Sequence, residues 1–266
     1  MQDNALSYNS LISLLPQEFY FVCADLPGHG KSDPFVEGLI LEITSYILSV
    51  KRVIQHFKWA KCYIVGHSLG AQLAFLFSAI YPEVVIKLIM IDGLTPFIVP
   101  AEDSPEHFKL CVKEVEKVEH TTRTRLPPSY TYEEALERMK SNRRGSLSDH
   151  AAKILLERSL IRSGTGYRFI TDQRLKYLIK PLYTMGHVEH FVNRVKCPVL
   201  LILAEDSVND YADVLGDYSH IILNGMIFKK PNFKVVVVSG DHNVHMNYPE
   251  RVSKHVIQFL VQNCSL

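Results

Sequence analysis

The chain has 266 residues and is 47% hydrophobic, which is enough material for one sizeable α/β core. Its 29 Lys and Arg residues nearly cancel its 28 Asp and Glu residues, so no broad electrostatic field indicates nucleic acid or an anionic membrane as the partner. No stretch approaches the roughly 18 uninterrupted apolar residues of a membrane span, and the first residues do not form a signal peptide. We therefore expect a cytoplasmic protein without a membrane span that acts on a small molecule.

The first part of the chain alternates between helical and strand-like patterns. Apolar residues at helical spacing predict a short helix within residues 5–15, and a compact aromatic and β-branched run at 19–26 predicts a buried strand. The elements expected after it are a helix at 39–57, a strand at 62–65, a helix at 73–81 and a strand at 84–91. Such alternation predicts an α/β fold with a mostly parallel sheet and helices on both faces.

A Gly-x-Ser-x-Gly pattern, Gly66-His67-Ser68-Leu69-Gly70, lies where a strand should turn into a helix. In such a turn the serine takes a sharp, strained conformation, and glycine at the flanking positions lets the neighbouring backbone pass without a clashing Cβ. The hydroxyl is then held out at the top of the sheet. This placement predicts that Ser68 is a catalytic nucleophile.

The alternation of predicted strands and helices is interrupted at residues 97–194. This region is richer in charge, and its helical patterns at 132–139 and 151–160 are not accompanied by any convincing strand, so we interpret it as a helical insertion. Strands at 198–204 and 233–239 and a helix at 249–261 follow. The predicted organisation is a core formed by residues 1–96 and 195–266, interrupted by an inserted unit at 97–194.

A serine hydroxyl is a weak nucleophile near neutral pH, so Ser68 needs a base and an acid that orients the base. His242 directly follows the last predicted strand and is the best candidate for the base. Asp206, just after the strand at 198–204, is the first choice for the acid, with Glu205 and Asp92 as alternatives.

Three segments together resemble the serine-hydrolase-like, or kraken-type, family of α/β-hydrolases. They are the turn Asp25-Leu26-Pro27-Gly28-His29-Gly30-Lys31-Ser32, the pattern from Gly66 to Gly70, and Gly240-Asp241-His242-Asn243-Val244-His245-Met246. The order Ser68, Asp206, His242 agrees with the serine, acid, histidine order of these enzymes. The resemblance implies an α/β-hydrolase fold, a cap formed by residues 97–194 and an esterase-like serine hydrolase that acts through an acyl-enzyme without a cofactor.

The same resemblance implies two features of the oxyanion hole. The backbone N–H of Leu69, the residue after the nucleophile, would supply one donor. A His-Gly loop and three strands would precede the helix at 5–15, and they are not in this sequence. We therefore expect an N-terminally truncated chain with impaired activity, in which the strand between residues 19–26 and 62–65 and the second oxyanion donor are missing.

Two other patterns have simpler structural interpretations. Gly28 and Gly30 are interpreted as a structural turn and not as a nucleotide loop, because no third glycine opens the next helix at the required spacing. His187, Glu189 and His190 lie together without the His-Glu-x-x-His order of a zinc site, so no metal is expected.

Further alternatives concern the surroundings of the site and the class of protein. His67 and His245 are expected to pack or hydrogen-bond beside the catalytic groups. The alternative function is a non-catalytic member of the fold that keeps the pocket to bind a ligand or a protein. The final residues Cys264-Ser265-Leu266 weakly resemble a peroxisomal address.

Overall fold

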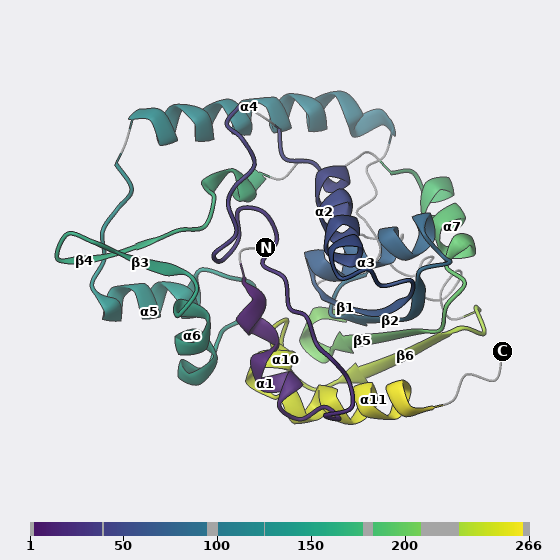
Figure 1. The fold of residues 1–266 in the computed structure, drawn as a ribbon. Coiled ribbons are helices and arrows are strands. Elements are labelled where there is room, and N and C mark those ends of the chain that lie inside the picture. The colour runs from purple at the N-terminus through teal and green to yellow at the C-terminus, as the bar shows by residue number, and fades with distance from the viewer. Residues whose placement is uncertain are drawn as a thin grey trace.

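A four-stranded parallel sheet, in the order β1-β2-β5-β6, lies at the centre of the protein (Figure 1). The structure is a computed structural model that describes residues 3–38, 40–94, 101–124, 126–177, 183–208 and 229–262. The strands are β1 Cys62–His67, β2 Val85–Ile91, β5 Val199–Ala204 and β6 Phe233–Val238. Since the four strands are parallel, their carboxyl ends meet at one edge of the sheet, where Ser68 directly follows β1 and Asp92 directly follows β2.

Helices cover both faces of this sheet, as the alternation in the sequence predicts (Figure 1). The helices on one face are α2 Ile43–His56, α3 Leu69–Ile80 and α7 Met185–Arg194, and those on the other are α1 Asn9–Ile12, α10 Val244–Asn247 and α11 Pro249–Val261. On β2, Leu88 and Met90 belong to the apolar cluster around α3, whereas Ile89 and Ile91 belong to the cluster that includes α11. This alternation of side chains is that of a strand buried on both faces.

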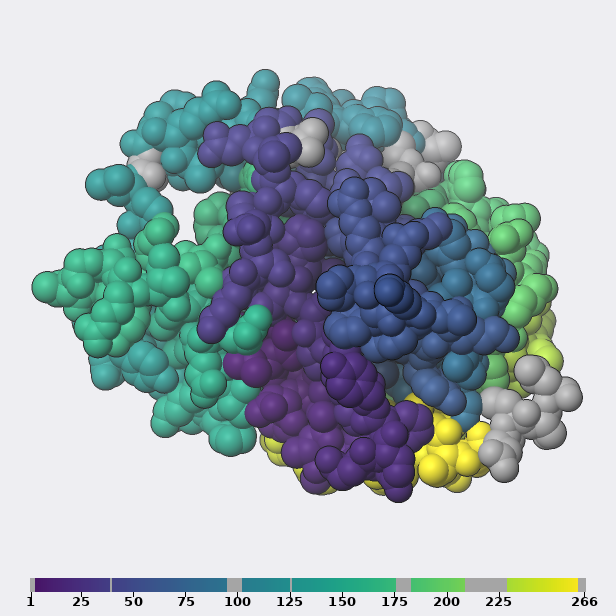
Figure 2. Space-filling model, viewed as in Figure 1, coloured from purple at the N-terminus to yellow at the C-terminus, as the bar shows by residue number. Residues whose placement is uncertain are grey.

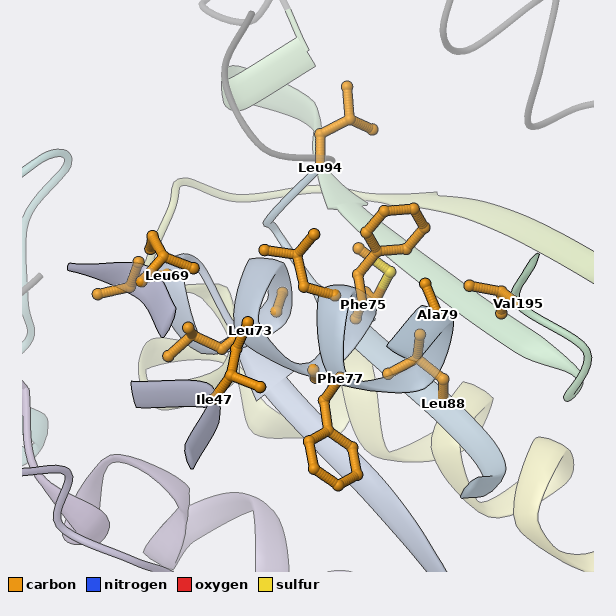
Figure 3. Packing of buried hydrophobic residues seen from close by; sticks show 14 of the residues in the cluster. Ile47, Leu69, Leu73, Phe75, Phe77, Ala79, Leu88, Leu94 and Val195 are labelled. Carbon is orange, nitrogen blue, oxygen red and sulfur yellow. The ribbon is translucent and has the colours of Figure 1, made fainter. Parts of the chain in front are cut away.

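Helix α3 is the most buried helix of the core. Its residues from Ala71 to Ala79 are all buried, and it packs against β1, β2, α2 and α7. Figure 3 shows Leu73, Phe75 and Phe77 projecting from it in different directions into this packing. Close packing on all sides holds the N-terminus of α3, and with it Ser68, in one position.

The inserted region lies between β2 and β5 and contains a hairpin as well as helices. Its elements are η2 Ala101–Asp103, α4 Ser104–Thr124, α5 Tyr132–Ser141, α6 Asp149–Leu156, β3 Leu160–Ser163, β4 Gly166–Phe169 and η3 Gln173–Tyr177. The structure confirms a helix close to each of the two predicted positions. Our expectation of no strand is wrong, because β3 and β4 pair antiparallel. Strands of four residues are too short to display a recognisable period.

Residues 19–26 do not form the strand that we predicted. The side chains of Phe19 and Phe21 pack against the cluster beside α11, and the Phe19 ring meets the edge of Tyr63 at a centroid distance of 5.7 Å. Within the described residues, however, β1 pairs only with β2, and no strand lies beside residues 19–26 to receive their backbone hydrogen bonds. Apolar composition therefore predicts the packing of this segment correctly but not its pairing. Cys23 is exposed as a result.

The turn after this segment connects the core to the inserted region. The Asp25 carboxylate accepts hydrogen bonds from the backbone N–H groups of Ala5, at 2.7 Å, and Lys31, at 2.9 Å. The guanidinium of Arg158, which follows α6, donates to the same carboxylate at 2.5 Å. Burial would raise the pKa of Asp25, but these hydrogen bonds outweigh burial and hold the pKa below its usual value. The turn is therefore a structural junction, as the sequence indicates.

None of the helices in the described ranges combines the length and the apolarity needed to cross a bilayer. The C-terminal segment that weakly resembles a peroxisomal address lies outside the described residues.

Candidate active site

Ser68 lies at the junction of β1 and α3 with a strained backbone, φ 52° and ψ −119°. A positive φ is rare for a residue with a side chain and is typical of functional sites that the surrounding structure holds in place. A Cβ on Gly66 would lie 2.3 Å from the carbonyl oxygen of Gly70, and a Cβ on Gly93 would lie 2.5 Å from that of Ser68. The sharp turn thus requires glycine at positions 66 and 93.

The second glycine of the sequence pattern is different. The nearest atom to a Cβ built on Gly70 is the Tyr8 hydroxyl at 3.8 Å, an ordinary contact distance. Our expectation that both flanking glycines are needed for close approach is therefore correct for Gly66 and wrong for Gly70. The second close approach occurs at Gly93, which follows β2 and which no local pattern singles out.

The structure brings a serine, a histidine and an aspartate into one hydrogen-bonded chain. Nε2 of His242 lies 2.9 Å from Oγ of Ser68, and Nδ1 of His242 lies 2.5 Å from Oδ2 of Asp92. Because an ionised carboxylate only accepts hydrogen bonds, Nδ1 carries the proton and Nε2 is left to accept the proton of the Ser68 hydroxyl. This is the arrangement that a general base needs.

Asp92 is completely buried and has further donors around its carboxylate. Oδ1 accepts a hydrogen bond from the backbone N–H of Ala204 at 2.8 Å, and Oδ2 accepts one from the Ser207 hydroxyl at 2.6 Å. Burial would raise the pKa of Asp92, but the hydrogen bonds from His242, Ser207 and Ala204 outweigh it and keep the pKa below its usual value. The carboxylate therefore stays ionised beside His242. The sequence analysis did not identify Ser207 as a hydrogen-bond donor to this carboxylate.

The acid beside His242 is thus Asp92, which was an alternative in our sequence analysis, and not the expected Asp206 or Glu205. Both of these lie just beyond β5 with exposed side chains, and the backbone N–H of Asp206 donates to the carbonyl of Gly240. The strand order explains the difference. Since β2 lies directly beside β1, the residue at its tip is the nearer neighbour of Ser68, and β5 is one strand further away.

The donor expected for the oxyanion hole, the backbone N–H of Leu69, lies at the start of α3. Leu69 is the first residue of α3, and N–H groups in the first turn of a helix have no acceptor within the helix. Its side chain is buried in the core. The positive end of the α3 dipole also favours negative charge at this place.

A cavity of about 2270 Å³ has Ser68 and His242 in its walls and runs from the inserted region along residues 18–27 and beside β1. Its walls include Val118 of α4, Arg143 after α5 and Arg168 of β4. Figure 2 shows an opening beneath the teal atoms of α4, next to the purple N-terminal segment. Ser68 therefore faces a cavity whose walls come from both the core and the inserted elements.

The sequence profile of the family described as alpha/beta hydrolase fold matches residues 3–249. The chain belongs to this α/β-hydrolase family. It is similar to the serine hydrolase-like protein of Danio rerio, with 34% identity over 97% of this chain and 78% of that protein. It is also similar to human serine hydrolase-like protein 2, with 32% identity over 97% of this chain and 83% of that protein.

The fold of this α/β hydrolase is also found among solved structures. A hypothetical protein from Pseudomonas aeruginosa has a TM-score of 0.82 and 30% identity, covering 98% of this chain and 88% of that one. The predicted fold and the resemblance to serine-hydrolase-like proteins are confirmed by these similarities.

Two further histidines of this α/β hydrolase lie beside the triad, as expected from sequence. The rings of His67 and His245 are tilted by 38° with a centroid distance of 4.0 Å, and Nε2 of His67 lies 2.7 Å from the carbonyl oxygen of His242. His245 is fully buried, and neither of its ring nitrogens has a hydrogen-bond partner among the described residues. Burial and the neighbouring imidazole of His242 lower the pKa of His245 to about 3.

The loop that carries His242 is hydrogen-bonded to residues 143–148 of the inserted region. The Asp241 carboxylate accepts from the backbone N–H of Ser146 at 2.9 Å, and the Asn243 side chain donates to the Arg144 carbonyl at 2.9 Å. Arg143 donates to the Asn243 side chain at 3.1 Å. We call these contacts the cap latch. The latch fixes one side of the loop that carries His242 to the inserted region.

The sequence cluster at 187–190 has a structural explanation in this α/β hydrolase. Nδ1 of His187 lies 2.9 Å from the Thr184 hydroxyl and takes part in the cap of α7. The described residues contain no group of three or more His, Cys, Asp or Glu side chains arranged to hold a metal ion.

Proposed function

We propose that this protein is a serine hydrolase that cleaves a small ester-like or amide-like substrate through an acyl-enzyme. The observation that supports the proposal is the hydrogen-bonded chain of Ser68, His242 and Asp92, with distances of 2.9 and 2.5 Å, at the wall of a large cavity. This arrangement matches the requirements of nucleophilic catalysis by serine without any cofactor.

In the first half of the proposed reaction, Ser68 Oγ attacks the carbonyl carbon of the substrate while His242 Nε2 takes the hydroxyl proton. Asp92 holds the imidazole in the required tautomer and stabilises the positive charge that develops on it. His242 then gives this proton to the leaving group, and the acyl group remains on Ser68. In the second half, His242 Nε2 removes a proton from water, whose oxygen attacks the acyl carbon. His242 then returns this proton to Ser68 Oγ as the bond between Oγ and the acyl carbon breaks, which releases the acid and restores the resting enzyme.

The N–H of Leu69 is the donor that we assign to the oxyanion. It is the one donor that we identify among the described residues.

An ester is the substrate class that we favour. Among proteins with the same fold, one described as a marine microorganism esterase has a TM-score of 0.62 and 19% identity, and a Mycobacterium tuberculosis esterase has a TM-score of 0.65 and 17% identity. These likenesses are of fold only, so the class is a proposal for this chain.

The test uses a fluorophosphonate probe together with p-nitrophenyl acetate. The probe should label the wild-type chain at Ser68, and hydrolysis should disappear in Ser68→Ala. A protein that only binds a ligand in this cavity would not be labelled, and its hydrolysis rate would be at background both with and without Ser68. That outcome would reject the proposal.

A further inference from the structure

The imidazole of His67 is aimed at the backbone of the catalytic histidine and not at the reacting atoms. Its Nε2 lies 2.7 Å from the carbonyl oxygen of His242, whereas the Ser68 hydroxyl is hydrogen-bonded to Nε2 of the His242 ring. We propose that His67 is a positioning residue, which donates a hydrogen bond to the His242 carbonyl and so holds the His242 ring between Ser68 and Asp92. This inference rests on the proposed function, and it adds a residue that acts through another.

His67 is itself held firmly. It is the last residue of β1, paired in register with Ile91 of β2. Its ring centroid lies 4.0 Å from that of His245, and the His245 ring centroid lies 5.7 Å from that of Tyr8. A donor held at the end of a strand and packed against a neighbouring ring loses little conformational freedom when it binds an acceptor.

The direction of this hydrogen bond fixes the chemical form of His67. A backbone carbonyl can only accept, so Nε2 of His67 must carry a proton. The neutral ring satisfies this condition with its proton on Nε2, and a second positive charge is then avoided near His242. The two rings are 4.7 Å apart, and a charged His67 would oppose the positive charge that His242 acquires when it takes the proton of Ser68.

The groups around His67 favour its neutral form. Burial is the largest influence and, with the imidazoles of His245 and His242, lowers the pKa of His67 well below its usual value. The carboxylates of Asp3 and Asp92 act in the opposite direction and are outweighed. Two further ionisable groups lie in this neighbourhood, Tyr8 of the N-terminal segment and Arg143 of the cap latch.

The His242 carbonyl needs such a donor because the ring has two partners to satisfy at once. A rotation of the loop backbone would lengthen the contact with Ser68 or with Asp92, and misplacement by about 1 Å can cost roughly 10²-fold in rate. The cap latch holds the residues on either side of His242, Asp241 and Asn243. Among the described residues, His67 is the donor to the carbonyl of His242 itself.

The experiment compares His67→Gln with His67→Met. The two replacement side chains are similar in size and flexibility, but only glutamine can donate a hydrogen bond to the carbonyl. With p-nitrophenyl acetate, we expect kcat to fall roughly 10- to 100-fold in His67→Met with KM nearly unchanged, and to recover most of this loss in His67→Gln. The two variants should have similar melting temperatures, since they differ in the donor and not in volume.

A spectroscopic signal tests the same idea without a substrate. The His242 Nδ1 proton shared with Asp92 should give a proton NMR resonance far downfield in the wild type and in His67→Gln. It should broaden or vanish in His67→Met.

The outcomes separate this inference from the proposed function. Equal kcat values and equal downfield signals in the two variants would overturn the role of His67. If Ser68→Ala hydrolyses the ester as well as the wild type, the proposed function fails instead, and the NMR comparison still decides whether His67 positions His242.

Discussion

The hydroxyl of Ser207 donates to Oδ2 of Asp92 at 2.6 Å, the same oxygen that His242 contacts. Two residues that lie beyond neighbouring strands, β2 and β5, thus meet at one buried carboxylate. The contact orients this carboxylate for His242, and it makes Ser207 a supporting part of the site.

We expect Asp92→Asn to lower kcat by roughly 10⁴-fold, because an amide at this place favours the wrong tautomer of His242. Ser207→Ala should lower it by about tenfold, since one hydrogen bond to the carboxylate is lost. The measurement is steady-state hydrolysis of p-nitrophenyl acetate by purified variants.

Asp206→Asn is the matched control for Asp92→Asn, because Asp206 is exposed at the end of the next strand. It should keep nearly full activity. If the substitution at 206 were the more damaging of the two, the assignment of Asp92 as the acid would be wrong.

The two glycines of the pattern around Ser68 should respond differently to alanine. In Gly66→Ala the new methyl group would lie 2.3 Å from a backbone oxygen, so we expect loss of folding or of probe labelling at Ser68. In Gly70→Ala the nearest neighbour is 3.8 Å away, so the protein should fold and be labelled normally. Circular dichroism melts and fluorophosphonate labelling check both variants, and equal damage at the two positions would contradict this account.

Buried His245 should make the protein sensitive to acid. Its folded pKa of about 3 lies below the value of about 6.5 expected in the unfolded chain, so between these values the unfolded state binds a proton that the folded state does not. The free energy of unfolding should therefore decrease as the pH falls below about 6.5, by up to roughly 1.4 kcal/mol for each pH unit. His245→Leu should remove this part of the slope.

Urea denaturation at pH 7.5 and pH 5.5 measures the slope. His120→Gln, which changes an exposed histidine of α4, serves as the control and should leave the slope as in the wild type. At pH 7.5 His245→Leu should be no less stable than the wild type, since it removes two buried nitrogens that lack partners among the described residues. An unchanged slope in His245→Leu would contradict the prediction.

Buried Lys87 should contribute strongly to stability. Its Nζ donates to the carbonyl oxygens of Phe259, Leu260 and Gln262 at 2.7, 3.0 and 2.8 Å, and so caps the C-terminal end of α11. Hydrogen bonds to a charged group contribute about 1.5 to 3 kcal/mol each when measured singly, and a cation also favours the negative end of a helix. We expect Lys87→Met to lower the free energy of unfolding by roughly 2 to 4 kcal/mol.

The corresponding substitution of an exposed lysine, Lys61→Met, should change stability by less than about 0.5 kcal/mol. Chemical denaturation of both variants gives the comparison. Fluorophosphonate labelling of the folded fraction should be unaffected in Lys87→Met, because Lys87 lies far along β2 from the carboxyl edge of the sheet. A loss no greater than that of the surface variant would show that the three carbonyls have other adequate partners.

Much of the core could be predicted from local patterns. Ser68 and His242, which form the hydrogen bond at the centre of the proposed site, are recognisable because Ser68 has a glycine-flanked turn and His242 follows a predicted strand. The acid could not be chosen this way. Asp92 and Asp206 both follow strands, and the choice between them depends on which strand lies beside β1, which is a property of the whole sheet.

The other differences have the same origin in distant contacts. The need for glycine at 93 arises from the approach of Ser68, and the role of Ser207 arises from its contact with Asp92. Residues 19–26 have the composition of a buried strand, but a strand forms only where a neighbour accepts its backbone hydrogen bonds.

The cap latch restricts how this enzyme can change its preference for substrates. Residues 143–148 support the loop of His242, so a longer or displaced backbone there would disturb the catalytic machinery together with the pocket. Lys117 and Val118 of α4 and Arg168 and Phe169 of β4 line the same cavity and take no part in the cap latch. Selection for new substrates can therefore change the cavity residues of α4 and β4 while residues 143–148 stay constant. Libraries of engineered variants should be built on α4 and β4.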